Sequence, residues 1–187
     1  KFRGDISLFD EGRKILHELT GVPVVGVIPY FRDIYIEEED SVSLESKNTR
    51  AGSDKINVAI VLLKRLSNFT DFSVLERDER FHTYYTNNVE EIGKADIIIL
   101  PGTKNTIADL QNIKANGIAD AIIRAHKDGK KVIGICGGYQ MLGARIEDPD
   151  RIEGETTSIP GLGILPLITV MEPEKVTRQS RFQFRNH

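Results

Sequence analysis

The sequence predicts an α/β fold with an open, mostly parallel sheet that is covered by helices on both faces. The main observation is the order of segments: from residue 56 onward, short apolar runs alternate with stretches whose apolar residues recur at helical spacing. The apolar runs are also nearly continuous, which is typical of strands buried between two layers of helices. Strands that alternate with helices favour a mostly parallel sheet.

The elements of this sheet are expected in a regular order along the chain. Strands are predicted at residues 56–63, 71–76, 80–86, 95–102 and 130–135. Helices are predicted at residues 106–113, 117–129 and 137–146. The sequence contains no internal repeat and no low-complexity tract.

A partial α/β segment precedes this domain. Apolar residues between Ile6 and Leu19 recur at roughly helical spacing, with Asp5 in the N-cap position and Gly21 in the stopping position, which predicts a helix. The run VPVVGVIPY at residues 22–30 is β-branched and bounded by prolines, and it predicts one buried strand. The pair has the pattern of the end of an α/β unit.

The stretch between these two parts is polar and lacks periodicity, as linkers do. We therefore place a domain boundary in it. The predicted parts are a domain remnant at residues 1–36, a linker at residues 37–55 and a second domain at residues 56–187.

Composition argues against several classes of protein. The chain carries 25 basic and 28 acidic residues, so its net charge of −3 gives no general attraction to nucleic acid. Its longest apolar runs are far shorter than the roughly 20 residues that cross a bilayer. A single cysteine excludes an internal disulfide and fits a reducing, cytoplasmic location. We predict no nucleic-acid partner, no membrane contact and no metal site.

Cys136 is the strongest candidate for chemistry. The stretch 134–138 reads Gly-Ile-Cys-Gly-Gly between a predicted strand and a predicted helix, which is the G-x-C-x-G form of a nucleophile elbow. Side chains two residues either side of the nucleophile would clash with neighbouring backbone in so tight a turn. The helix start favours the thiolate, and the N–H of Gly137 points where an oxyanion would form. The other interpretation is a buried structural cysteine whose glycines serve only helix packing.

A second turn is expected to face the same crevice. Residues 97–106 read IIILPGTKNT, a buried strand that ends at Pro101-Gly102. The ends of such strands meet at one edge of an open α/β sheet, where ligands bind. The N–H of Gly102 is therefore a candidate for a second oxyanion donor, and residues 103–106 are polar groups or an N-cap for the next helix. The other interpretation is an ordinary turn between a strand and a helix.

Together, ILPGTKNT at residues 99–106 and GICGGYQMLG at residues 134–143 resemble the class I glutamine amidotransferase domains of the cobyric and cobyrinic acid synthase family. Residues 161–179 are similar to the segment that follows the nucleophile in that family, and residues 1–30 resemble the tail of its ATP-dependent domain, which is related to dethiobiotin synthetase. The resemblance implies a flavodoxin-like sheet and the supply of ammonia from glutamine for ATP-dependent amidation of corrin carboxylates in cobalamin biosynthesis. The block at residues 1–30 favours the cobyric acid branch.

The resemblance also implies roles for individual residues. Cys136 would attack the side-chain amide of glutamine and form a γ-glutamyl thioester. Gly102 and Gly137 would donate main-chain N–H groups to the oxyanion. Tyr139 and Gln140 would line the glutamine pocket, or else serve helix packing. The corrin substrate would bind to the synthetase domain.

Two parts of the family's machinery are not found in the sequence. The phosphate-binding loop G-x-x-x-x-G-K-[ST] is absent, so ATP and Mg²⁺ are expected in a missing synthetase part and no cofactor is expected in this chain. The family's catalytic histidine follows the nucleophile, whereas His17, His82 and His126 fit surface or packing roles and His187 is the last residue. We expect the chain to be a segment of a longer enzyme and to be inactive alone.

Three other functions remain open at this point. One is cobyrinic acid a,c-diamide synthase, or another ATP-dependent ligase with the same module, such as those that amidate cell-wall precursors. The second is a non-catalytic, amidotransferase-like binding module, which would lack a Cys136 reactive toward glutamine-like electrophiles. The third is redox sensing or hydrolysis by a protein that shares the elbow, which would leave the 101–106 turn and residues 1–30 unexplained.

Overall fold

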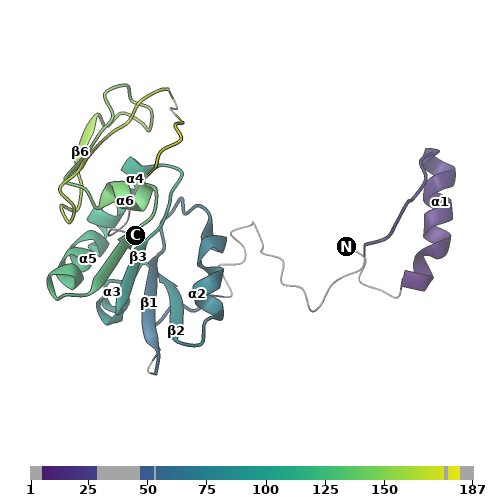
Figure 1. The fold of residues 1–187 in the computed structure, drawn as a ribbon, viewed down its shortest axis with the longest axis horizontal. Helices are drawn as coiled ribbons and strands as arrows, with labels where there is room; N and C mark the ends of the chain where they lie inside the picture. Colours follow the sequence, from purple (N-terminus) through teal and green to yellow (C-terminus); the bar gives the residue numbers. More distant parts are fainter. Residues whose placement is uncertain (1–5, 29–46, 53, 175–176, 182–187) are drawn as a thin grey trace. The chain divides into compact units, whose positions relative to one another are not determined.

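The computed structural model describes residues 6–28, 47–52, 54–174 and 177–181 (Figure 1). The chain divides into two compact units, Lys1–Glu38 and Glu39–His187. The family identity of residues 1–36 and the linker at 37–55 stay predictions. Within the larger unit, residues 47–52 already contact the sheet, because the carbonyl of Asn48 accepts a hydrogen bond from the N–H of Tyr85 at 2.8 Å.

The smaller unit contains a short 3-10 helix, η1 (Ile6–Phe9), and the helix α1 (Asp10–Thr20). Gly21 ends α1 in the left-handed conformation, with φ of 68°, and its N–H donates to the carbonyl of His17. The predicted stop at Gly21 is thus confirmed, while the predicted N-cap Asp5 lies outside the described residues. No residue of α1 is buried within this unit.

The strand predicted at residues 22–30 is wrong over its described part. Residues 22–28 form no strand, and the side chain of Val25 is 95% exposed. A strand is held by hydrogen bonds to a neighbouring strand, and the described residues of this unit contain no second strand. The strand prediction failed because it was based on the β-branched composition of the segment alone.

The larger unit is built on a four-stranded parallel sheet. Its strands are β1 (Ile56–Val61), β2 (Phe81–Thr86), β3 (Ile97–Leu100) and β4 (Lys131–Gly134), in the order β2-β1-β3-β4. Every pairing in it is parallel. This confirms the predicted fold class and four of the predicted strands.

Helices cover both faces of this sheet. On one face, Ala59 and Val61 of β1 join a core with side chains from the longer helices, including Ile122. These helices are α3 (Val89–Lys94), α4 (Thr106–Ala115) and α5 (Ile118–Lys127). On the other face, Val58 and Ile60 pack in a second cluster that includes Phe72. Residues 56–61 thus supply apolar side chains to two separate cores, which explains their continuous apolar pattern.

The strand predicted at residues 71–76 is wrong. This segment forms the 3-10 helix η3 (Phe69–Phe72) and the helix α2 (Ser73–Arg77). Phe72 and Leu75 are three residues apart, so a helix directs both toward the second core. The prediction failed because three apolar residues within a six-residue segment do not distinguish a strand from a single helical turn. Helix α3 was not predicted.

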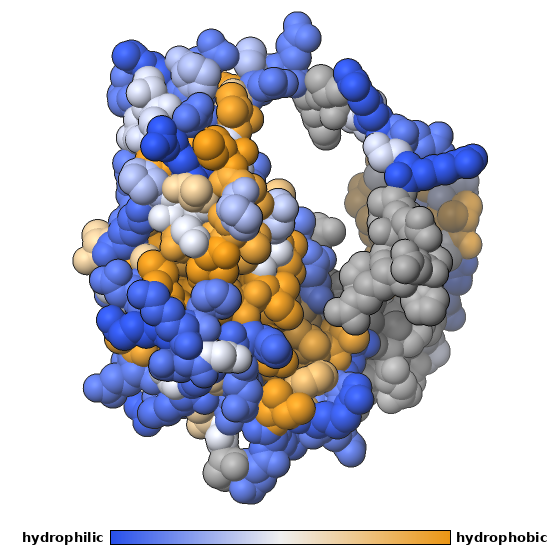
Figure 2. Space-filling model, turned by 60° about the vertical axis from the view of Figure 1, so that its left-hand side comes forward, coloured by the Kyte–Doolittle hydropathy of each residue, from blue (hydrophilic) through white to orange (hydrophobic). Residues whose placement is uncertain are grey.

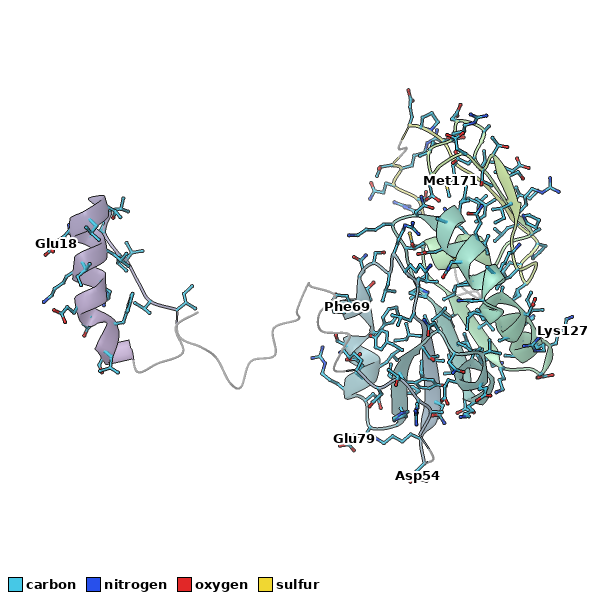
Figure 3. The ribbon with its side chains drawn as sticks, turned by 180° about the vertical axis from the view of Figure 1, so that it is seen from behind. Glu18, Asp54, Phe69, Glu79, Lys127 and Met171 are labelled. Carbon is cyan, nitrogen blue, oxygen red and sulfur yellow. The ribbon has the colours of Figure 1, made fainter. Side chains whose placement is uncertain are left out.

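A small second sheet follows the main one. It contains β5 (Arg145–Glu147), β6 (Ser158–Pro160) and β7 (Ile168–Val170) in the order β6-β5-β7. The helix predicted at residues 137–146 is shorter, because α6 spans Gly137–Met141 and Ala144 already donates its N–H to the carbonyl of Leu167. Figure 3 shows Asp54 and Glu79, which precede β1 and β2, at one end of the larger unit, and Met171 at the other. The small sheet therefore lies beyond the carboxyl ends of the main strands.

The second face of the main sheet is only partly covered. Ile133 of β4 pairs in register with Ile99 of β3, so both side chains lie on that face. Ile99 is 4% exposed, whereas Ile133 is 46% exposed. Figure 2 shows that apolar side chains form a broad band on the displayed face of the larger unit.

We predict that the same substitution at these two paired positions has unequal effects. Ile99→Ala removes a buried side chain and should lower the free energy of unfolding by about 2–5 kcal/mol. Ile133→Ala should lower it by about 1 kcal/mol, since its side chain already contacts water. Urea unfolding of the two variants measures both values. A loss at Ile133 as large as that at Ile99 would contradict the partial coverage of this face.

Candidate active site

The carboxyl ends of β3 and β4 bring two turns together. The N–H of Ile135, just after β4, donates to the carbonyl of Leu100 at the end of β3, at 3.0 Å. The chain then continues to Gly102 on one side and to Cys136 on the other. A Cβ atom added to Gly102 would lie 3.7 Å from the Cβ of Cys136. The two turns that the sequence singled out are therefore in contact.

Cys136 occupies a strained turn between β4 and α6. Its φ of 50° and ψ of −115° are unusual for a residue with a side chain. Such backbone strain costs on the order of 1–3 kcal/mol and is concentrated at functional sites. The residue is also exposed, so the interpretation as a buried structural cysteine does not describe it. This conformation is what a nucleophile elbow requires.

The glycines around Cys136 allow the close packing that the sequence predicted. A Cβ atom on Gly134 would lie 2.6 Å from the Cα of Tyr139, and one on Gly138 would lie 1.9 Å from the carbonyl oxygen of Leu100. Both distances are shorter than any real Cβ contact, and both involve main-chain atoms that cannot rotate away. The elbow is thus possible only with glycine at these two positions.

Two main-chain N–H groups lie beside the cysteine. Gly102 is adjacent to it in space, and Gly137 follows it at the first position of α6. Neither N–H donates to a main-chain acceptor in the turn and loop hydrogen bonds of the described residues. Because α6 has only five residues, its macrodipole is small, and these local N–H groups are the main polar influence of the turn. Their role as oxyanion donors stays a prediction.

Tyr139 and Gln140 lie on the helix that follows the elbow. The Tyr139 side chain is 50% exposed and so does not serve the core. The side-chain amide of Gln140 lies 3.3 Å from the hydroxyl oxygen of Thr106, at the start of α4. Gln140 therefore bridges the two turns of the site. Binding of glutamine by either residue stays a prediction.

The sequence did not reveal what holds the Gly102 turn in place. The carboxylate of Asp109, which is fully buried, accepts hydrogen bonds from the hydroxyl of Thr103 at 2.6 Å and from the N–H of Arg65 at 3.1 Å. The side chain of Asn105 caps α4 by accepting the N–H of Ala108, as predicted for residues 103–106. No local pattern in the sequence marks Asp109, because its burial is known only from the structure.

The described histidines of the larger unit lie away from Cys136. His82 is the second residue of β2 and pairs with Asn57, so it lies at the amino ends of the strands and on the opposite edge of the sheet. His126 lies near the end of α5, five residues before β4 begins, and so also at the amino ends. Neither can exchange a proton with a ligand at Cys136. His187 lies outside the described residues.

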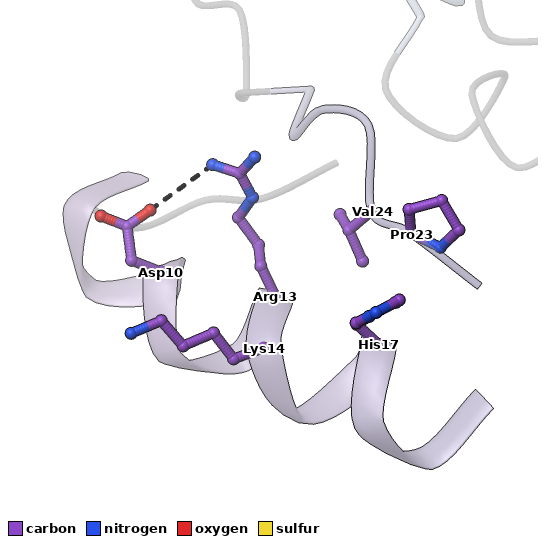
Figure 4. Close-up of a pocket in the computed structure, with 6 residues that line it drawn as sticks. All are labelled: Asp10, Arg13, Lys14, His17, Pro23 and Val24. Carbon is purple, nitrogen blue, oxygen red and sulfur yellow. Dashed lines mark ion pairs between the residues drawn. The ribbon is translucent and has the colours of Figure 1, made fainter. Parts of the chain in front are cut away.

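A cavity of about 500 Å³ lies in the smaller unit (Figure 4). It is lined by Asp10, Arg13, Lys14, His17, Pro23 and Val24. Asp10 and Arg13 form an ion pair at 3.6 Å, so two of its charged groups already satisfy each other. The cavity belongs to a different unit from Cys136.

The described residues contain no group of three or more histidine, cysteine, aspartate or glutamate side chains that could hold a metal ion. Within the same residues, no helix is long and apolar enough to cross a membrane.

The model of the CobB/CobQ-like glutamine amidotransferase domain matches residues 57–186. Cobyric acid synthase of Parabacteroides distasonis is 71% identical over 98% of this chain, and that of Bacteroides fragilis (strain ATCC 25285) is 63% identical over 98%. A third, from Alkaliphilus metalliredigens, is 47% identical over the whole chain. This chain spans 37% of the length of each of these three relatives.

We predict opposite effects for the same substitution at two glycines. Gly138→Ala should lower the free energy of unfolding by about 2–4 kcal/mol, since the added methyl group meets the carbonyl of Leu100. Gly93→Ala in α3 is the control: its added methyl group meets nothing within 4 Å, and alanine should stabilise the helix by about 0.5–1 kcal/mol. Denaturant unfolding measures both. Equal stability of the two variants would show that α6 does not pack against β3 as described.

Proposed function

Because this chain belongs to the CobB/CobQ-like glutamine amidotransferase family, we propose that it releases ammonia from glutamine at Cys136 as part of a cobyric acid synthase. The observation that carries this proposal is the strained, exposed Cys136 in contact with the Gly102 turn. Ammonia then serves the amidation of corrin carboxylates in cobalamin biosynthesis.

The chemistry follows from the groups that surround the thiol. The Cys136 thiolate attacks the carbonyl carbon of the glutamine side chain, and the carbonyl oxygen becomes an oxyanion. The N–H groups of Gly102 and Gly137 donate to that oxyanion. The C–N bond then breaks, a proton is delivered to the nitrogen, and ammonia leaves behind a γ-glutamyl thioester. Water hydrolyses the thioester to glutamate and restores the thiol.

Two of these steps need a positioned acid or base, usually a histidine. Departing ammonia must be protonated, and the water that attacks the thioester must lose a proton. The described histidines of the larger unit lie at the far end of the sheet from Cys136. We therefore place the acid/base group outside the residues that the structure describes.

The remaining parts of the reaction belong to the longer protein. The relatives are named cobyric acid synthase and are much longer than this chain. We propose that ATP, Mg²⁺ and the corrin substrate bind to a synthetase part, of which residues 1–36 are the tail. Sequence similarity over the whole chain, and not only over residues 57–186, supports this assignment.

We predict that glutamine hydrolysis depends on the Cys136 thiol. The test uses a chimera in which this chain replaces its matching segment in the full-length Parabacteroides distasonis relative. Cys136→Ala in the chimera should lower kcat for glutamate release by at least about 10³-fold, because no thioester can form. ATP-dependent corrin amidation with added ammonia should survive, which controls for folding of the synthetase part. Unchanged glutaminase activity would overturn the assignment of Cys136.

We also predict that this chain alone hydrolyses glutamine more slowly than the chimera does, while the Cys136 thiol is equally exposed in both. Its glutaminase rate should be at least about 10²–10⁴-fold lower, which is the usual contribution of general acid/base catalysis. Cys136 should still react with iodoacetamide, since it is exposed. Ammonia release and mass spectrometry of the alkylated chain measure the two quantities. Full turnover by this chain would show that one of its own residues supplies the proton.

A further inference from the structure

A short stretch of chain that follows β1 is hydrogen-bonded to the Gly102 turn. It spans residues 65–67 and pairs with the turn through an isolated antiparallel bridge. The N–H of Ser67 donates to the carbonyl of Gly102 at 3.0 Å, and the N–H of Lys104 donates to the carbonyl of Arg65 at 3.0 Å. We call residues 65–67 the bridge segment.

This pairing fixes the peptide group between Gly102 and Thr103. Its carbonyl points toward the bridge segment, because it accepts the N–H of Ser67. The N–H of a trans peptide points opposite to its carbonyl, so the N–H of Thr103 points away from the bridge segment. The nitrogen of Thr103 lies beside the elbow, since a Cβ atom added to Gly137 would be 3.5 Å from it. This N–H donates to no main-chain acceptor in the turn and loop hydrogen bonds of the described residues.

Asp109 of α4 joins the turn to the bridge segment from inside the protein. Its side chain is fully buried. One carboxylate oxygen accepts both the N–H of Arg65 at 3.1 Å and the hydroxyl of Thr103 at 2.6 Å. The other oxygen pairs with the Arg65 guanidinium at 3.3 Å. A buried carboxylate is costly without such partners, so Asp109 holds the two stretches of chain together.

We propose that Asp109 is a positioning residue that keeps the N–H of Thr103 directed toward the oxyanion formed at Cys136. This inference rests on the proposed function. Asp109 acts through the Thr103 hydroxyl and the bridge segment. Without the carboxylate these two groups lose their shared acceptor, and the peptide before Thr103 gains freedom to rotate. A donor that turns away destabilises the transition state more than the bound glutamine, so the loss should affect kcat and not KM.

Three variants of the chimera test this role. Asp109→Ala removes the shared acceptor. Thr103→Val keeps the shape of the side chain and removes its hydroxyl, so it decides the test if Asp109→Ala fails to fold. The third variant combines both substitutions. If Asp109 acts through Thr103, the double variant should lose no more activity than the more affected single variant.

The matched control is Glu91→Ala. Glu91 is also a buried carboxylate, and it accepts the N–H of Ala51 at 2.8 Å and pairs with Lys94 at 2.6 Å. None of its described contacts involves the turn or the bridge segment. Its loss should therefore lower stability without affecting the turn. For every variant we would measure kcat and KM for glutamine, the rate of Cys136 alkylation by iodoacetamide, and thermal unfolding.

The expected result is a loss confined to turnover. In Asp109→Ala and Thr103→Val, kcat for glutamate release should fall by about 10- to 100-fold, because displacing an oxyanion donor costs less than the roughly 10²–10³-fold lost when one is removed. KM should change by less than about 3-fold. Alkylation of Cys136 should keep its rate, since that reaction forms no oxyanion. Glu91→Ala should turn over glutamine like the unmodified chimera.

Several results would contradict the positioning role of Asp109. These are an unchanged kcat, additive losses in the double variant, and an alkylation rate that falls together with kcat. An equal loss of kcat in Glu91→Ala would also contradict it, because the effect would then follow from stability. An unmodified chimera that releases no glutamate would instead overturn the proposed function.

Discussion

The close approach of α6 to the end of β3 is the constraint on which the site depends. Gly138 lies so near the carbonyl of Leu100 that no side chain fits between them. This contact allows the chain to reverse within a few residues of β4, and the reversal holds Cys136 beside Gly102. The parallel register of β3 and β4 supports the same arrangement, because it brings both strand ends to one level. The geometry of the candidate site is a result of main-chain packing.

Polar contacts then set the finer geometry of the site. Asp109 anchors the Gly102 turn from inside the protein, and Glu153 joins the same region from the small sheet's side. Both carboxylates accept hydrogen bonds from main-chain N–H groups as well as from a threonine hydroxyl. The glycines therefore allow the tight turn at Cys136, and the two carboxylates hold the neighbouring loops in place.

The sequence revealed the parts of the structure that depend on local pattern. Continuous apolar runs predicted β1, β3 and β4, since these strands are buried or paired within one sheet. The spacing of glycines around Cys136 predicted the elbow. Residues 71–76 were misjudged because one turn of helix and one short strand share the same apolar content. The small sheet was missed because three-residue strands carry no periodicity. The contact between Glu153 and Thr106 joins residues 47 positions apart, and no local pattern records it.

The left-handed backbone at Cys136 also has an evolutionary consequence. Glycine adopts this conformation with less strain than cysteine does, because it has no Cβ atom. Replacing Cys136 by glycine would therefore relieve backbone strain and raise the free energy of unfolding. The cysteine occupies a position where thermodynamic stability alone selects against it. Under the proposed function, the chemistry of the thiol outweighs this cost.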